Sequence, residues 1–358
     1  MRSHAPPWAR GVSGRNLLRP WPSVPEAGAI DAEHDESHRG TPPPKPMPLP
    51  TSNEEETMRG SPAAALALVG VASIAFATDA PPPAARHASL PAASPDGKHV
   101  AFCSNRDGGA WELYVVDVDG RGLRRLTHSP EEELVPGWAD GGGSVVYMTV
   151  EGDTARLHSL PLEGGAARTL LALDAKGIKL SNDGRRVGYA VGSWTRNRLV
   201  VANADGSEAR AITDSSASYF NLAWSPDDGR IAATRSDSAG LQVWIMAPDG
   251  SEARAVTRSA KSDGSPQWPA WSPDGRQLAF QSGTYDRKDP AKSTAHIWII
   301  DLATGEATKL APHARPFLDE TPSWLADGKR IVFQSTRAGP FDLWIMRADG
   351  GAARRLTR

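Results

Sequence analysis

The chain of 358 residues has little of what marks redox, nucleic-acid or membrane-spanning proteins. Its single cysteine, Cys103, rules out a disulfide within the chain, and we expect it to be a small structural strand residue. The net charge is only −2, so composition favours neither nucleic acid nor an anionic membrane surface as a partner. The one long apolar run, residues 63–77, is too short to span a bilayer comfortably. We therefore expect no membrane span.

Hydrolase motifs are also missing from the sequence. An α/β serine hydrolase needs a Gly-x-Ser-x-Gly elbow, and none occurs before the sequence stops at Arg358, directly after the last repeat. Residues 34–38 contain two histidines and a glutamate, but not at the His-Glu-x-x-His spacing of a zinc protease. We therefore expect a protein that is not an enzyme, with no catalytic residues, no cofactor and no metal site.

The first 87 residues are unlike the rest of the chain. Residues 1–57 are rich in proline and show no strand or helix period, so we interpret them as a disordered leader or a wrongly assigned start before Met58. Residues 58–77 have the positive start, apolar run and small-residue end of a secretory signal peptide, with cleavage after Ala77. Residues 78–87 then form a linker. We expect the mature protein in the periplasm or secreted.

From residue 88 to residue 358 the sequence repeats one pattern six times. Each unit has a short apolar stretch, a turn with Asp and Gly, an alternating strand, a second strand and a second turn. The anchors before the first turns are 42–53 residues apart: Ala93, Trp138, Leu180, Trp224, Trp271 and Trp324. This period, with four strand-sized pieces per unit, is typical of β-propeller blades. We predict an all-β, six-bladed β-propeller with four antiparallel strands per blade.

Proline supports the strand order within each unit. Four units have a proline two residues before the anchor: Pro91, Pro136, Pro269 and Pro322. Proline has no N–H to donate to a neighbouring strand, so it belongs on a sheet edge. The first strand of each unit is thus predicted to be the innermost one, whose free edge faces a central channel.

The repeats resemble those of the TolB-like propeller family, also described as PD40 or WD40-like repeats. The resemblance is carried by residues 271–275 (WSPDG), 224–227 (WSPD) and 354–357 (RRLT), and it covers residues 88–358. It implies an exported protein of the cell envelope that binds a partner at the propeller mouth. TolB itself has an α/β domain between signal peptide and propeller, which residues 78–87 are too few to contain.

Two enzyme families are similar at the level of the repeats. Prolyl-oligopeptidase-like enzymes carry such a propeller but need a hydrolase domain, and oligogalacturonate lyases hold a metal with clustered His and Gln. In this chain the comparable residues are scattered over several blades: His87, His128, His313 and Gln267. Our first hypothesis is a non-catalytic module that binds a protein or an envelope component. The alternative is a propeller enzyme, similar to a polysaccharide lyase, with its site at the mouth.

The partner site is predicted on two long loops. The connection at residues 283–293 in the fifth unit and the connection at residues 311–320 before the sixth unit are longer than their equivalents. Loops on a rigid scaffold commonly carry binding residues, and aromatic, Arg and acidic groups are typical of binding hot spots. We predict a monomer that binds its protein or envelope partner, and no nucleic acid, through Tyr285, Arg287, His313, Arg315, Asp319 and Glu320.

Overall fold

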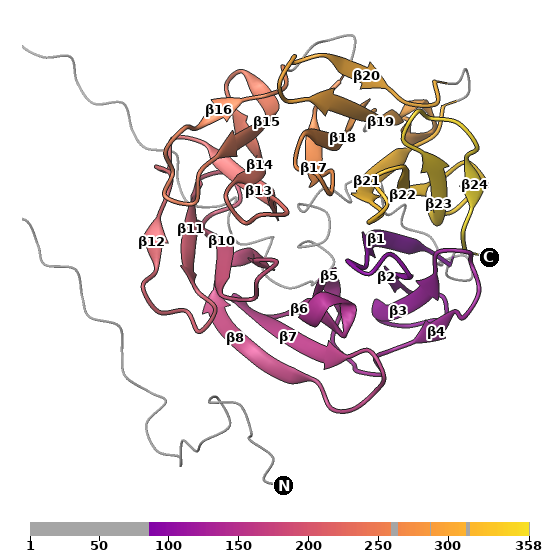
Figure 1. Cartoon of the computed structure of the whole chain (residues 1–358), viewed down its shortest axis with the longest axis horizontal. Coiled ribbons are helices and arrows are strands. Elements are labelled where there is room, and N and C mark those ends of the chain that lie inside the picture. The colour runs from indigo at the N-terminus through magenta and orange to yellow at the C-terminus, as the bar shows by residue number, and fades with distance from the viewer. Residues whose placement is uncertain (1–85, 259–263, 287, 313–315, 358) are drawn as a thin grey trace, which may run out of the picture. The chain divides into compact units, whose positions relative to one another are not determined.

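The computed structural model describes residues 86–258, 264–286, 288–312 and 316–357. These residues form six sheets of four antiparallel strands, set around one axis as the blades of a propeller (Figure 1). The predicted fold class is therefore confirmed. The expected leader, the signal peptide and residues 78–85 of the linker lie outside the described residues. No helix in the described part of the chain is both long enough and apolar enough to cross a membrane.

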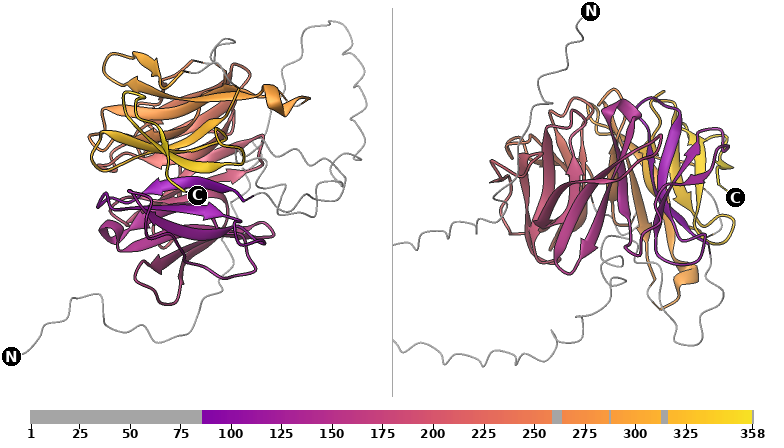
Figure 2. Two further views of the ribbon diagram at one scale, coloured as in Figure 1. Left: turned by 90° about the vertical axis from the view of Figure 1, so that its right-hand side faces the viewer. Right: turned by 90° about the horizontal axis from the view of Figure 1, so that it is seen from below.

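The strands follow one another in the sequence from the inner to the outer edge of each blade (Figures 1 and 2). Blades one to three comprise β1 (Ala88–Ala93), β2 (His99–Ser104), β3 (Glu112–Asp117), β4 (Arg124–Arg125); β5 (Leu134–Ala139), β6 (Ser144–Glu151), β7 (Thr154–Pro161), β8 (Arg168–Asp174); β9 (Lys176–Leu180), β10 (Arg186–Gly192), β11 (Asn197–Asn203), β12 (Arg210–Ala211). Blades four to six comprise β13 (Ser218–Trp224), β14 (Ile231–Asp237), β15 (Gly240–Met246), β16 (Arg254–Ala255); β17 (Gln267–Trp271), β18 (Gln277–Thr284), β19 (Thr294–Asp301), β20 (Ala307–Lys309); β21 (Asp319–Trp324), β22 (Arg330–Ser335), β23 (Asp342–Arg347), β24 (Arg354–Arg355). The described residues also contain two short 3-10 turns, η2 (Asp140–Gly142) and η3 (Pro290–Lys292).

The turn after each inner strand is built from its own side chains. In blade five, the Ser272 hydroxyl donates to Asp274 at 2.6 Å and accepts the backbone N–H of Gln277 at 2.9 Å. Gly275 then takes a φ of +67°, which costs glycine nothing. The same serine–aspartate bond recurs in blades one, three and four. The repeated Ser-x-Asp sequence thus fixes one compact turn at equivalent places in these four blades.

The anchor tryptophans join neighbouring blades. The indole N–H of Trp138 donates to Ala92 O at 2.9 Å, and that of Trp224 donates to Lys179 O at 3.2 Å. Trp271 makes the equivalent bond to Ala223 O at 3.1 Å. A buried indole N–H needs such a partner, and for these three tryptophans the partner is the inner strand of the preceding blade, whereas the indole N–H of Trp324 has none among the described residues. The tryptophans therefore belong to the packing between blades.

The ring closes without a shared strand. Every sheet consists of consecutive strands, so blade six is completed by β24 and blade one by β1. The junction is held by the bond from Ala88 N–H to Phe341 O at 2.8 Å and by an apolar cluster. That cluster includes Phe102 from blade one and Leu325 and Leu343 from blade six. Packing and hydrogen bonds alone hold this junction, whereas the chain itself crosses the other five.

Candidate functional site

The six inner strands enclose a central cavity of about 300 Å³. The four prolines predicted at the inner edge line it, which confirms the predicted order of strands. Each inner strand also has a β-bulge, so that its register with the second strand shifts at the same place in all six blades. The bulge residues have positive φ, an uncommon conformation: Leu90, Val135, Gly177, Asn221, Trp268 and Thr321. Bulges of this kind turn backbone groups away from the sheet ladder.

A side chain of the preceding blade accepts the N–H of several bulge residues. Gln334 Oε1 accepts the Leu90 N–H at 3.0 Å, and Gln281 Oε1 accepts the Thr321 N–H at 2.8 Å. Thr234 Oγ1 plays the same part for Trp268 at 3.2 Å. We call this the acceptor position, because it pairs in register with the residue just before each bulge. It is occupied in blades one to six by Cys103, Met148, Ala190, Thr234, Gln281 and Gln334.

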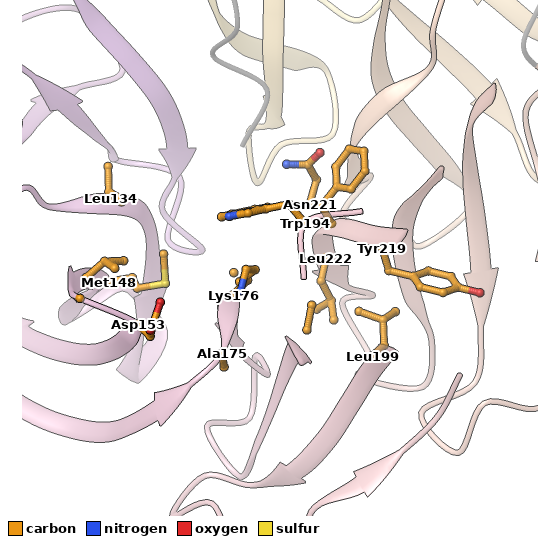
Figure 3. Close-up of a pocket in the computed structure, with 15 residues that line it drawn as sticks. Leu134, Met148, Asp153, Ala175, Lys176, Trp194, Leu199, Tyr219, Asn221 and Leu222 are labelled. Carbon is orange, nitrogen blue, oxygen red and sulfur yellow. The ribbon is translucent and has the colours of Figure 1, made fainter. Parts of the chain in front are cut away.

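Blades one, two and three have no side-chain oxygen at the acceptor position, and the apolar pocket lies beside the bulges that follow blades two and three. Met148 and Ala190 carry no oxygen that could accept a backbone N–H. The bulge residues that follow them, Gly177 and Asn221, border a pocket of about 120 Å³ beside the channel. Figure 3 shows Leu134 and Met148 on one side of this pocket and Leu222 on the other. The absence of a polar side chain at two acceptor positions thus coincides with an apolar pocket.

Charged and aromatic residues form the rim of this pocket. The Lys176 ammonium lies 5.2 Å from the centre of the Trp194 ring and donates to Gly192 O at 2.9 Å. Asp153, on the loop between β6 and β7, also borders the pocket (Figure 3). The rim therefore carries one charge of each sign beside a partly exposed tryptophan. Such a pocket, apolar with a few polar groups at its edge, is typical of small-molecule and peptide sites.

Blades five and six form a polar cluster at the corresponding place. The Tyr285 hydroxyl donates to Glu320 Oε1 at 2.8 Å and accepts from Gln281 Nε2 at 3.0 Å. Gln334 Nε2 donates to the other carboxylate oxygen of Glu320 at 3.0 Å. Burial raises the pKa of Glu320 to about 7, against the effect of these two donors. Burial, with Glu320 close by, also raises the pKa of Tyr285 well above its usual value.

Of the predicted binding residues, the structure describes Tyr285, Asp319 and Glu320. Asp319 and Glu320 are each only 1% exposed, and Arg337 pairs with Asp319 at 2.6 Å. These two carboxylates were expected on an exposed loop, and that expectation is wrong, because both are buried at the start of β21. Three further predicted residues lie outside the described residues: Arg287, His313 and Arg315. Binding of a partner at these loops stays a prediction.

Of the residues compared with a metal site, the structure describes His87, His128 and Gln267, whereas His313 lies outside the described residues. His87 is partly buried, with its ring centre 6.3 Å from that of Trp111 and also 6.3 Å from that of Phe341. His128 is exposed on the connection to blade two, whereas Gln267 is buried in β17. In the described part of the chain, no group of three or more His, Cys, Asp or Glu residues could hold a metal ion.

Sequence reasoning missed the apolar pocket entirely. Its walls come from three blades, and no single stretch of sequence contains them. One signal was available: aligned repeats place Met148 and Ala190 where blades five and six have glutamine. That alignment shows a change in polarity but not the cavity that accompanies it.

Comparison with known proteins identifies the repeats. A model of the TolB beta propeller domain (PD40) matches residues 83–218 and 187–358. Dipeptidyl-peptidase 5 of Porphyromonas gingivalis is 23% identical over 328 residues, covering 75% of this chain and 47% of that protein. The Tol-Pal system protein TolB of Anaeromyxobacter dehalogenans is 28% identical over 173 residues, or 47% of this chain and 37% of that protein. This chain therefore spans less than half of the length of these curated relatives.

A solved structure supports the same fold. The crystal structure of TolB from Acinetobacter baumannii aligns with a TM-score of 0.57 at 18% identity, covering 73% of this chain and 67% of that one. The peptidase relative corrects one expectation. We expected a protein that is not an enzyme, but the match to dipeptidyl-peptidase 5 overturns this and points to a peptidase-like family. On the family model and the six-bladed ring together, the chain belongs to the TolB beta propeller domain (PD40) family.

Proposed function

We propose that this chain is the propeller part of a peptidase-like protein and that it binds peptides at the apolar pocket beside its channel. The pocket is the observation that carries the proposal, because it is mostly apolar and bordered by charges of both signs. The match to dipeptidyl-peptidase 5 over 75% of the chain supports a peptide as the ligand. Peptide hydrolysis by the whole protein is part of this proposal.

The pocket has the chemistry that a peptide needs. Leu134, Met148 and Leu222 offer apolar contacts for one side chain of a peptide. The N–H groups of Gly177 and Asn221 receive no side-chain acceptor from Met148 or Ala190, so they are suited to donate to a peptide carbonyl. At the rim, Asp153 and Lys176 complement the charged groups that peptides carry at either end.

Transplanting the polar acceptor into blade three tests this site. In Ala190→Gln, the new amide should accept the Asn221 N–H as Gln281 accepts that of Thr321, and it should fill the pocket. We expect peptide affinity to fall at least tenfold. The measurement is calorimetric titration of the full chain with short peptides that differ at one apolar side chain, alongside release of amine from dipeptidyl amides.

Leu123→Gln is the matched control, because it makes a similar change at a side chain that is 42% exposed and distant from the pocket in sequence. It should bind peptides as the unchanged chain does. Equal peptide affinity in the unchanged chain and in folded Ala190→Gln would contradict the site. A chain that neither binds peptides nor hydrolyses the amides would contradict the peptide proposal as a whole.

We also propose that residues 58–77 direct export to the periplasm or the medium. The proposal rests on the positive start, the apolar run and the Ala-Phe-Ala end at residues 75–77. N-terminal sequencing of protein from cell fractions tests it. A mature chain that begins at Thr78 outside the cytoplasm supports export, and cytoplasmic protein that keeps residues 58–77 refutes it.

A further inference from the structure

One cation stands in the wall of the central channel. Lys179 lies on β9 in blade three, and its side chain borders the channel together with the inner strands of the other blades. Its ammonium approaches Val135 O at 3.3 Å and Pro136 O at 3.5 Å, both on the inner strand of blade two. Its backbone is fixed by the bond that Lys179 O accepts from the Trp224 indole. The ammonium is therefore held at the channel wall rather than in bulk solvent.

The other five blades place small uncharged residues at the same point. Lys179 pairs in register with Gly188, and the equivalent residues of the other inner strands pair with the same position of their second strands. Those equivalents are Ala92, Gly137, Ala223, Ala270 and Ser323. Among the described residues that line the channel, Lys179 is the only one with a charged side chain. The five small residues thus leave space in the channel beside the single positive charge of Lys179.

The ammonium lacks a counter-anion in the described part of the protein. No described carboxylate forms an ion pair with Lys179, and its two contacts with carbonyl groups are long. Burial lowers the pKa of Lys179 to about 8, so it still carries its charge at neutral pH. A charge taken out of water without a partner is unfavourable, and an anion in the channel would relieve that cost.

We propose that Lys179 binds the carboxylate of a ligand that enters the channel. The channel volume of about 300 Å³ admits a small acid or the end of a peptide, and the carbonyls of Val135 and Pro136 orient the ammonium. The ligand chemistry is a carboxylate with little other charge, since no second cation lines the described channel. This inference concerns the channel and stands apart from the proposed pocket, which it adjoins at Gly177 and Asn221.

The test compares ligands that differ only in the carboxylate. The unchanged chain is titrated at pH 7 with a tripeptide that ends in a free carboxylate, with the same peptide amidated, and with succinate. We expect the free acid to bind at least tenfold more tightly than the amide. If succinate competes with the acid, the site takes small free acids. If succinate does not compete, it takes a peptide C-terminus. Either result supports a carboxylate site.

Two variants assign the effect to Lys179. Lys179→Met keeps the length of the side chain without the charge, and it should bind acid and amide equally. Lys179→Arg keeps the charge and should retain most of the preference, and thermal melts show that each variant is folded. Equal binding of acid and amide by the unchanged chain overturns the proposal, as does a preference that survives in Lys179→Met. Peptide binding that persists without a carboxylate preference would leave the peptide proposal standing.

Discussion

The two sides of the ring treat the same backbone position in opposite ways. In blades five and six the acceptor position is Gln281 or Gln334, and each glutamine accepts a bulge N–H of the next blade. In blades two and three it is Met148 or Ala190, and the next bulge borders a pocket. The strand pairing at all these positions is equivalent. The side chain at this position therefore decides whether the bulge N–H of the next blade has a side-chain oxygen as its acceptor.

This difference shows how a repeated scaffold makes room for a site. A bulge exposes a backbone N–H, and burying that N–H without a partner is costly. Glutamine meets the need within the protein and, through Glu320 and Tyr285, ties two blades together. Where methionine or alanine replaces it, the N–H can serve a ligand. The side-chain acceptors of bulge N–H groups thus lie at the three junctions from blade four round to blade one, and the apolar pocket lies in blades two to four.

The largest effect on stability is expected when the acceptor position of blade six receives methionine, the residue found there in blade two. Gln334→Met removes the acceptor of the Leu90 N–H, and it removes the donor to Oε2 of Glu320, which keeps only the bond from Tyr285 at Oε1. We expect the free energy of unfolding to fall by about 2–4 kcal/mol. Urea unfolding measures the loss, and hydrogen exchange should place it at the junction of blades six and one.

The matched control is Met148→Leu at the acceptor position of blade two. No hydrogen bond is lost there, so the free energy of unfolding should change by less than about 1.5 kcal/mol. Equal losses in Gln334→Met and Met148→Leu would break the comparison between the two sides. Faster exchange of Gln334→Met at a different junction would contradict the role of Gln334 in holding blade six to blade one.

A smaller effect is expected in how the free energy of unfolding depends on pH, because Glu320 lies in the polar cluster of blades five and six. The pKa of Glu320 in the folded protein, about 7, lies above its usual 4.5 because of burial. Its contribution to stability is therefore fully present below pH 4.5 and is lost as the pH rises through 7. Between pH 5 and 7 the free energy of unfolding should fall by up to about 1 kcal/mol per pH unit. Glu320→Gln should reduce this slope.

Glu133 provides the control for that measurement. Burial also raises its pKa to about 7, but it lies at the junction of blades one and two. Glu133→Gln should remove its own share of the slope and leave that of Glu320 unchanged. Thermal melts of both single variants and of the double variant from pH 5 to pH 8 separate the two. A slope unchanged in Glu320→Gln means that this carboxyl does not titrate in the window.

The smallest effect is expected on the apolar side. Ala190 borders the pocket of about 120 Å³, and Ala190→Val adds two methyl groups to it. Filling a cavity typically stabilises a protein, so the free energy of unfolding should rise by about 0.5–1 kcal/mol. Gln281→Val should instead destabilise the fold, because the Thr321 N–H loses its acceptor. A destabilising Ala190→Val would show that the pocket is already packed as tightly as a core.

Much of the fold was readable from the sequence. Three features revealed it: the six anchors, the Asp-Gly turns and the prolines at one register. The turns and prolines reflect local backbone requirements, such as a positive φ or a missing N–H, which consecutive residues show directly. The sequence did not reveal that Asp319 and Glu320 are buried, because their burial depends on contacts with other segments. Their loop is long and polar in sequence, but both residues belong to β21 and both are buried, with Asp319 bonded to Ser335 and Glu320 bonded to Gln334.

The sequence alone determined the number of blades, the order of strands and the chain's place in the propeller family. Periodicity in residues becomes periodicity in strands through short-range geometry, and no distant contact is needed to see it. Only the tertiary structure decided which junctions are open and where charge is enclosed. Met148, Ala190 and Lys179 are ordinary residues in their own strands. They become the walls of a pocket and the cation of a channel because ring closure brings together residues that are 40 or more positions apart and shuts out water.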